Sequence, residues 1–132
     1  MMTRILLVSA GGALGAVARY GAGALAARLA PAAAWPLATL SVNVAGGLLM
    51  GLLTGWLAFR DGAQGEAIRL FAAVGVLGGF TTFSAFSLET ALMIERRQLA
   101  MAGGYAALSV ALSIAALFGG LMVARRAFGA AL

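Results

Sequence analysis

The sequence GVLGGFTTFSAFS, residues 75–87, lies near the middle of the third of four long apolar segments. Its three glycines are followed by β-branched and hydroxyl residues, which have low helix propensity and can bond to nearby backbone groups. This composition predicts a break in a membrane-spanning helix. A break at membrane depth is tolerated only where protein or a cavity satisfies the freed backbone groups. The helix ends that it creates offer N–H groups to anions and carbonyl oxygens to cations.

The whole chain has the composition of a membrane protein. Of its 132 residues, 63% are hydrophobic and 10% are charged, whereas a soluble domain is roughly 45–50% apolar and about 25% charged. A spanning helix needs about 20 mostly apolar residues. We therefore predict an all-α membrane protein with one transmembrane domain, residues 1–132. Its four transmembrane helices are expected at about 4–28, 36–59, 67–96 and 99–125, with loops at the prolines near 31–36, at 61–65 and at 95–98.

Several functional classes are excluded by residues that the chain lacks. It has no Cys and no His, and its nine basic residues are all Arg. This removes a thiol nucleophile, a Ser–His–Asp triad, a Cys/His zinc site and a lysine for a phosphate loop. We therefore expect no enzyme activity. The arginines are scattered singly or in pairs, which suits anchoring to membrane lipid and does not suit binding to nucleic acid.

The arginines divide unevenly between the two ends of the four predicted helices. The side with both termini carries Arg4, Arg60, Arg69, Arg125 and Arg126, and the other carries Arg28, Arg96 and Arg97. Five against three is a weak positive-inside bias. Two interpretations stay open. Either the termini lie in the cytoplasm, or the orientation is barely specified and copies insert both ways.

Glycines recur at four-residue spacing on three of the predicted helices. Small residues at this spacing let helix backbones approach closely within a bilayer. The pattern identifies packing faces, but it does not distinguish contacts within one chain from contacts between chains. The glycines concerned are Gly11 and Gly15, then Gly47, Gly51 and Gly55, then Gly75 and Gly79.

Two predicted helices carry polar side chains along one face. Thr39 and Asn43 are one turn apart on the second helix, and Tyr105, Ser109 and Ser113 follow at the same spacing on the fourth. The amide of Asn43 has two N–H donors, so it either bonds a neighbouring helix or lines a path for an anion. The hydroxyl stripe is open to the same two interpretations, packing and pathway, because serines often bond back to their own helix.

Further candidates lie near the predicted break and in the first helix. Phe83 and Phe86 share a face beside Ser84. They are either ordinary apolar contacts or, because an aromatic edge is partly positive, lining for an anion path. Arg19 lies inside the first span, where it supplies either a positive vestibule or a structural cap for free carbonyls. Glu89 receives no role beyond snorkelling or pairing with an arginine.

Three motifs together resemble the Fluc (CrcB) fluoride channel family. They are GGALGAVARY at residues 11–20, WP at 35–36 followed by TLSVNVAG at 39–46, and GGFTTFSAF at 78–86. They occur in the family's order, and the resemblance covers the whole chain. Ala85 stands where the family motif frequently has Thr.

The resemblance implies a function that composition alone does not show. It implies a fluoride-selective passive ion channel in the bacterial inner membrane, which exports cytoplasmic fluoride and so reduces its toxicity. Channels of this family are antiparallel dual-topology homodimers with two pores, an arrangement that would explain the weak arginine bias. The expected partners are fluoride, a second copy of the chain and membrane lipid.

The resemblance also implies which residues act. The fluoride pathway is expected to include Asn43, Phe83, Phe86, Thr39, Ser84, Tyr105, Ser109 and Ser113. The backbone carbonyls of Gly78 and Thr81 are expected to hold a structural sodium ion shared by the two subunits. Sodium is a hard cation, which suits carbonyl oxygens freed by a break.

Two alternatives belong to other functional classes. A small four-helix multidrug or cation exporter would want a membrane-embedded carboxylate, usually in the first helix. Here that helix carries Arg19 and no acid, and Glu89 is the only candidate. A chromosome-associated membrane factor would need an extended basic surface to grip DNA, and none is present in the sequence.

Overall fold

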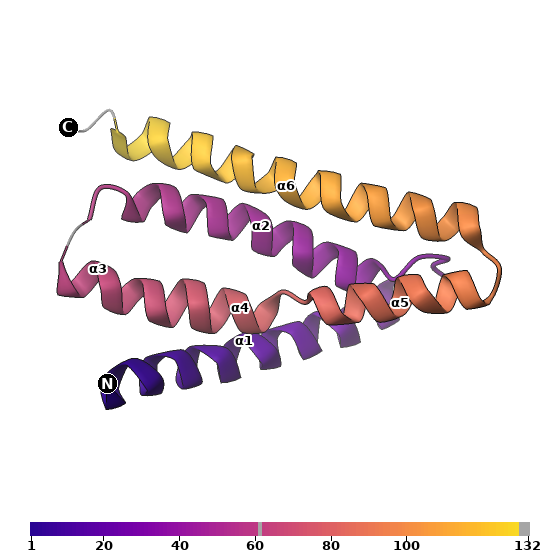
Figure 1. Cartoon of the computed structure of the whole chain (residues 1–132), viewed down its shortest axis with the longest axis horizontal. Helices are drawn as coiled ribbons and strands as arrows, with labels where there is room; N and C mark the ends of the chain where they lie inside the picture. Colours follow the sequence, from indigo (N-terminus) through magenta and orange to yellow (C-terminus); the bar gives the residue numbers. More distant parts are fainter. Residues whose placement is uncertain (61, 130–132) are drawn as a thin grey trace.

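The computed structural model describes residues 1–60 and 62–129, and every regular element there is helical (Figure 1). The elements are α1 (Met2–Leu29), α2 (Leu37–Leu57), α3 (Ala63–Ile68), the π-helix η1 (Arg69–Leu77), α4 (Gly78–Phe80), α5 (Phe83–Glu95) and α6 (Leu99–Gly129). The segment from α3 to α5 forms one span, so four stretches are long and apolar enough to cross a membrane. The prediction of an all-α membrane protein with four transmembrane helices is confirmed.

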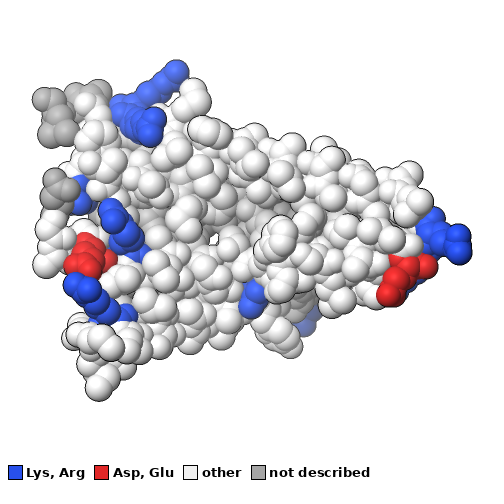
Figure 2. All heavy atoms as spheres, viewed as in Figure 1, with Lys and Arg blue, Asp and Glu red and all other residues white. Residues whose placement is uncertain are grey.

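The four spans run lengthwise beside one another, with the N-terminus and the end of α6 at the same end of the bundle (Figure 1). Helix α2 packs mainly against α6, while α1 packs mainly against η1 and α4. Most charged side chains lie at the two ends of the molecule, and the surface between them is largely apolar apart from basic side chains at its lower edge (Figure 2). Such an apolar surface suits contact with lipid or with an apolar surface of another protein.

The third span is broken near its middle, as predicted, at the two threonines that follow the glycines. Thr81 (φ −79°, ψ 159°) and Thr82 (φ −153°, ψ 117°) are extended. The first half ends where the Thr81 N–H and hydroxyl both donate to the Leu77 carbonyl, at 3.0 and 2.8 Å. The second half begins with Thr82 as its N-cap, whose hydroxyl accepts from the Ala85 N–H at 3.1 Å. Side-chain oxygens that replace helix hydrogen bonds therefore locate the break.

The glycines of the third span remain helical and provide close contact with α1. A Cβ added to Gly75 would lie 2.8 Å from the Gly11 Cα, and one added to Gly79 would lie 2.5 Å from the Gly12 oxygen. Real side chains do not approach that closely, so only glycine fits. We call this contact of α1 with η1 and α4 the first glycine seam.

A second glycine seam joins α2 to α6. A Cβ added to Gly47 would lie 2.6 Å from the Ser113 oxygen, and one added to Gly55 would lie 2.6 Å from the Ala124 Cβ. Both seams lie within one chain, which answers the question that the glycine spacing left open. The small residues let backbones touch where no hydrophobic effect drives helices together.

Two of the predicted helix bounds differ from the structure by four residues, and the others agree with it to within two residues. The third span begins at Ala63 rather than 67, directly after Gly62, whose φ of 93° makes the turn. Position 61 lies outside the described residues. The fourth helix continues to Gly129 rather than 125. Arg125 and Arg126 do not end it, because arginine is a good helix former whose long side chain reaches water from an apolar surface.

Candidate functional site

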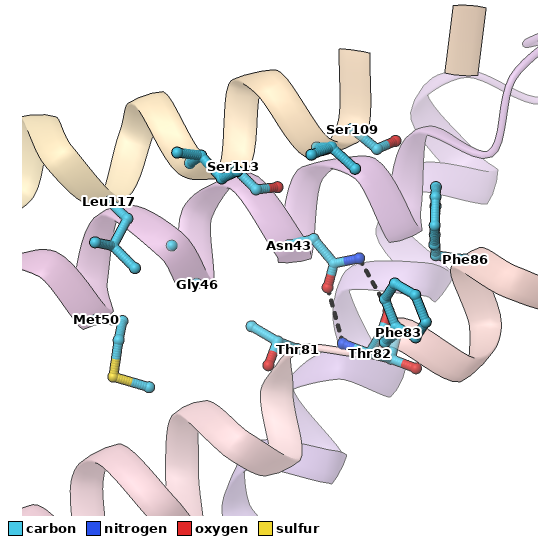
Figure 3. A pocket seen from close by; sticks show the side chains of 13 residues that line it. Asn43, Gly46, Met50, Thr81, Thr82, Phe83, Phe86, Ser109, Ser113 and Leu117 are labelled. Carbon is cyan, nitrogen blue, oxygen red and sulfur yellow. Dashed lines mark hydrogen bonds between the residues drawn. The ribbon is translucent and has the colours of Figure 1, made fainter. Parts of the chain in front are cut away.

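Asn43 of α2 holds the extended backbone of the break with two hydrogen bonds. Its Nδ2 donates to the Thr82 carbonyl at 2.9 Å, and its Oδ1 accepts from the Thr82 N–H at 2.8 Å (Figure 3). The amide thus satisfies backbone groups that the break would otherwise leave unpaired in the bilayer. A primary amide has two N–H bonds, and these contacts use one of them. Asn43 therefore serves the fold and still has a donor for a ligand.

A groove of about 410 Å³ opens beside this amide. It is bordered by α2, by the break and α5, and by α6. Its polar lining comes from Asn43, Thr81, Thr82, Ser109 and Ser113, and the rest is apolar. Figure 3 shows the two serines of α6 on one side of the groove and the amide and the threonines on the other.

Phe83 and Phe86 line the same groove at the start of α5. Their ring centroids are 5.4 Å apart with the planes at 45°, and Phe86 lies 5.5 Å from the ring of Tyr105. Phe83 is 75% exposed, whereas Tyr105 is fully buried. Phe83 thus lines the groove with a ring that this chain leaves largely uncovered.

Ser109 carries a buried polar atom without a partner. The residue is 5% exposed and lines the groove, and in the described part of the chain its Oγ has no hydrogen-bond partner. A buried hydroxyl left unpaired costs about 1–3 kcal/mol. Such an atom is therefore expected to meet a ligand or water in the groove.

Tyr105 and Thr39 do not line this groove. Their hydroxyls donate to the two carboxylate oxygens of Glu89, each at 2.6 Å. The sequence did not indicate a role for Glu89, because its partners are far away along the chain. Thr39 is 50 positions from Glu89, and Tyr105 is 16 positions from it. The available signal was its spacing of three residues from Phe86, which puts both on one face of α5.

Two other predicted residues lie outside the groove. Ser84 is exposed, and its hydroxyl is 3.2 Å from that of Thr82. Arg19 lines a second cavity of about 210 Å³ together with Thr39 and Thr82. Thr82 lines both cavities, so the break separates the groove from the cavity that contains the intramembrane arginine.

The predicted cation ligands lie at the end of the first half of the broken span. Gly78 is exposed and Thr81 is half-buried. Because the chain leaves the helix at Thr81, the last turn lacks the following N–H groups that would bond its carbonyls. Among the described residues no group of three His, Cys, Asp or Glu side chains could hold a metal ion. A cation here would rely on backbone carbonyl oxygens, which fit a hard monovalent ion.

Comparison with known proteins shows the family of the chain. Residues 6–121 match the family described as CrcB-like protein, Camphor Resistance (CrcB). A protein of Caulobacter sp. (strain K31) named fluoride-specific ion channel FluC is 62% identical over 127 residues, 96% of this chain and 98% of that protein. Proteins of the same name from Phenylobacterium zucineum and Caulobacter vibrioides (strain NA1000 / CB15N) are 59% and 57% identical, over 96% of this chain and 99% of each. A match of this extent, on a chain with four apolar spans and a broken third helix, means that the protein belongs to the CrcB family.

Proposed function

We propose that this protein is a fluoride-selective passive ion channel of a bacterial inner membrane that exports cytoplasmic fluoride, and that it is not an enzyme. The observation that carries the proposal is the groove at the break, where the Asn43 amide, the unpartnered Ser109 hydroxyl and two phenylalanine rings meet. The relatives' name, fluoride-specific ion channel, supports fluoride as the ion.

The groove chemistry suits a small, strongly hydrated anion. Water removed from such an ion must be replaced by other donors, and these must release the ion again. The amide N–H, the hydroxyls of Ser109 and Ser113, and the positive edges of Phe83 and Phe86 form a graded set of donors without a strong fixed charge. Nothing in the sequence suggests use of ATP, so the flow is downhill.

A cation exporter is not favoured. Its substrate site would require an accessible membrane-embedded carboxylate, whereas both oxygens of Glu89 are bonded to hydroxyls. The relatives' name is that of a channel. Cation export and fluoride flux are separated by the assay described next.

The proposal is tested by flux from liposomes that contain the purified protein. Liposomes loaded with potassium fluoride should release fluoride to an external electrode when valinomycin balances the charge. Liposomes loaded with potassium chloride should release little chloride under the same conditions. Protein-free liposomes serve as the control. Equal rates for the two halides, or no fluoride release from correctly folded protein, would contradict the proposal.

We also propose that two copies assemble as an antiparallel homodimer. One chain leaves the groove open, with Phe83 exposed, and its apolar outer surface is large. A second copy in the opposite orientation would cover this side and complete two equivalent pathways. The five-to-three distribution of arginines supports insertion in both orientations.

The topology is tested with reporters fused to the C-terminus. A reporter active only in the cytoplasm and one active only in the periplasm should both give signal in cells that express the same chain. Two lysines added to one loop should bias insertion and lower fluoride flux, and coexpression of oppositely biased chains should restore it. Signal from only one reporter would refute dual insertion.

We further propose that the carbonyl oxygens of Gly78 and Thr81 hold a structural sodium ion between the two subunits. The exposure of Gly78 and the end of the helix at Thr81, which leaves carbonyl oxygens of the last turn free, support this assignment. The ion would tie together two helix C-termini, whose partial negative charge attracts a cation. It would act on assembly and would take no part in selecting fluoride.

Replacement of sodium tests this assignment. Protein purified and reconstituted with N-methylglucamine as the sole cation should lose fluoride flux, and added sodium should restore it with a saturable dependence. Potassium should restore less, because a site of fixed size selects among cations. Full flux without any sodium would remove the ion from the proposal and leave the fluoride pathway untouched.

A further inference from the structure

Glu89 is a carboxylate within the membrane-spanning part of α5 whose hydrogen-bond partners are two hydroxyls. Thr39 of α2 donates to its Oε1 and Tyr105 of α6 donates to its Oε2, both at 2.6 Å. Among the described residues, an ion pair with a nitrogen-to-oxygen distance within 4.0 Å is formed by Arg4 and Glu66, and none is formed by Glu89. The contacts that stabilise Glu89 within this chain are therefore hydroxyl hydrogen bonds rather than a basic side chain.

The hydrogen-bonded group of Glu89, Thr39 and Tyr105 connects residues of the two cavities. Thr39 lines the smaller cavity, which also contains Arg19. Tyr105 packs against Phe86 of the groove at a centroid distance of 5.5 Å. It precedes the groove residue Ser109 by one turn of α6. The two hydroxyls therefore lie between residues that line the groove and residues that line the smaller cavity.

The direction of the two hydroxyl protons decides what an anion meets there. An ionised carboxylate only accepts hydrogen bonds, and each hydroxyl has one proton to donate. Protons donated to Glu89 are not available to fluoride. The carboxylate and the permeating anion thus compete for the same two donors.

We propose that Glu89 is a positioning residue that keeps fluoride binding weak at this end of the pathway by holding the protons of Thr39 and Tyr105. Conduction requires that an ion bind well enough to enter and weakly enough to leave. Two hydroxyls free to turn toward fluoride would make a deep site that releases the ion slowly. The inference rests on the proposed fluoride channel function and deepens it.

Glu89→Gln tests the inference with a nearly isosteric change. A glutamine oxygen can accept from one hydroxyl, while its NH₂ group donates to the other and so releases that proton. The fluoride concentration that gives half-maximal flux should fall about tenfold, the scale of one additional hydrogen bond to an ion. The maximal flux should fall as well. Flux is measured in liposomes over a range of fluoride concentrations, and dimer assembly is checked by gel filtration.

Glu95→Gln is the matched control, because it makes the same change on an exposed carboxylate at the end of α5. It should leave the half-maximal concentration unchanged. Glu89→Gln should also have no effect on that concentration in a Thr39→Val/Tyr105→Phe background, where no hydroxyl proton remains to be released. A half-maximal concentration that is unchanged or raised in the single variant, or equally lowered in this background, overturns the inference.

A second variant covers the case in which Glu89→Gln does not assemble. Glu89→Asp retains the charge but is one methylene shorter, so it should lose the hydrogen bond from one of the two hydroxyls. The half-maximal fluoride concentration should then fall, as in Glu89→Gln. An unchanged value would overturn the inference. Failure of the proposed function gives a different result, because the unsubstituted protein would then release no fluoride at all.

Discussion

The two glycine seams and the groove at the break differ in how completely their residues are packed and hydrogen-bonded within one chain. In the seams, glycines of α1 and α2 bring their helices into backbone contact with η1, α4 and α6, and the contact is complete within one chain. In the groove, Phe83 is exposed and the buried hydroxyl of Ser109 has no partner among the described residues. The seams are therefore complete within one chain, whereas the groove leaves an exposed ring and an unpaired hydroxyl that the proposed second copy and ion would cover.

The difference shows how a small membrane protein can keep polar groups in a groove without hydrogen-bond partners of its own. The seams fix α1 against the first half of the broken span and α2 against α6. Asn43 can then meet the break at a fixed position, with bonds of 2.8 and 2.9 Å to one residue. Rigid packing on either side allows the polar groups between them to be placed for a ligand rather than for one another.

The largest effect is expected from a side chain placed in a seam. A Cβ at Gly15 would lie 2.8 Å from the Phe80 N, so Gly15→Ala forces α1 away from α4. We expect a loss of at least about 3 kcal/mol of stability, at the upper end for overpacking, seen as aggregation in gel filtration. Gly21→Ala is the matched control on the same helix, because a Cβ there meets nothing within 4 Å. A well-assembled Gly15→Ala protein would show that the seam is looser than the structure indicates.

The second largest effect is expected from a change at Asn43, which lies between the second glycine seam and the groove. Asn43→Asp keeps the acceptor for the Thr82 N–H, but it places a carboxylate oxygen against the Thr82 carbonyl. It also puts a negative charge in the anion path, so we expect fluoride flux to fall by about 100-fold or more. The assay is liposome efflux beside a gel-filtration profile. Ser41→Ala, an exposed polar residue on the same helix, should retain full flux. Asn43→Asp with near-normal flux would remove the amide from the pathway.

The phenylalanine pair separates groove lining from ordinary packing. If Phe83 and Phe86 only pack, Phe→Ile at either site costs at most about 1.5 kcal/mol and leaves flux intact. If their edges face the ion, the variant protein still folds but flux falls by about tenfold or more, because isoleucine has no positive edge. We expect the second outcome. Phe118→Ile, on an exposed position of α6, is the control. Normal efflux from both variants would reduce the pair to packing.

The sequence predicted the seams and the existence of the break, because both depend on local composition. Glycine spacing identified the faces, and only the structure showed that they meet within one chain. The position of the break was not predictable from the glycines, since it depends on the Thr82 cap and on Asn43, 39 residues away. Glu89 was left without a role for the same reason, because its two partners lie on other helices. Contacts between helices decide which polar residue is structural, and no local pattern encodes them.

Ser109 gives the smallest expected effect and the finest test of whether the groove is built for a ligand. Its buried hydroxyl has no partner within the described chain. Ser109→Ala should therefore stabilise the fluoride-free protein by about 1 kcal/mol, because it removes an unpaired polar atom. Fluoride should raise the thermal midpoint of the original protein more than that of the variant, and the variant's flux should fall about threefold, the scale of one weak hydrogen bond. Ser41→Ala, whose hydroxyl bonds its own helix, should show neither change. If Ser109→Ala instead destabilises the protein and fluoride shifts both midpoints equally, the hydroxyl belongs to the packing of α6 and the groove is less closely fitted to an ion than its lining suggests.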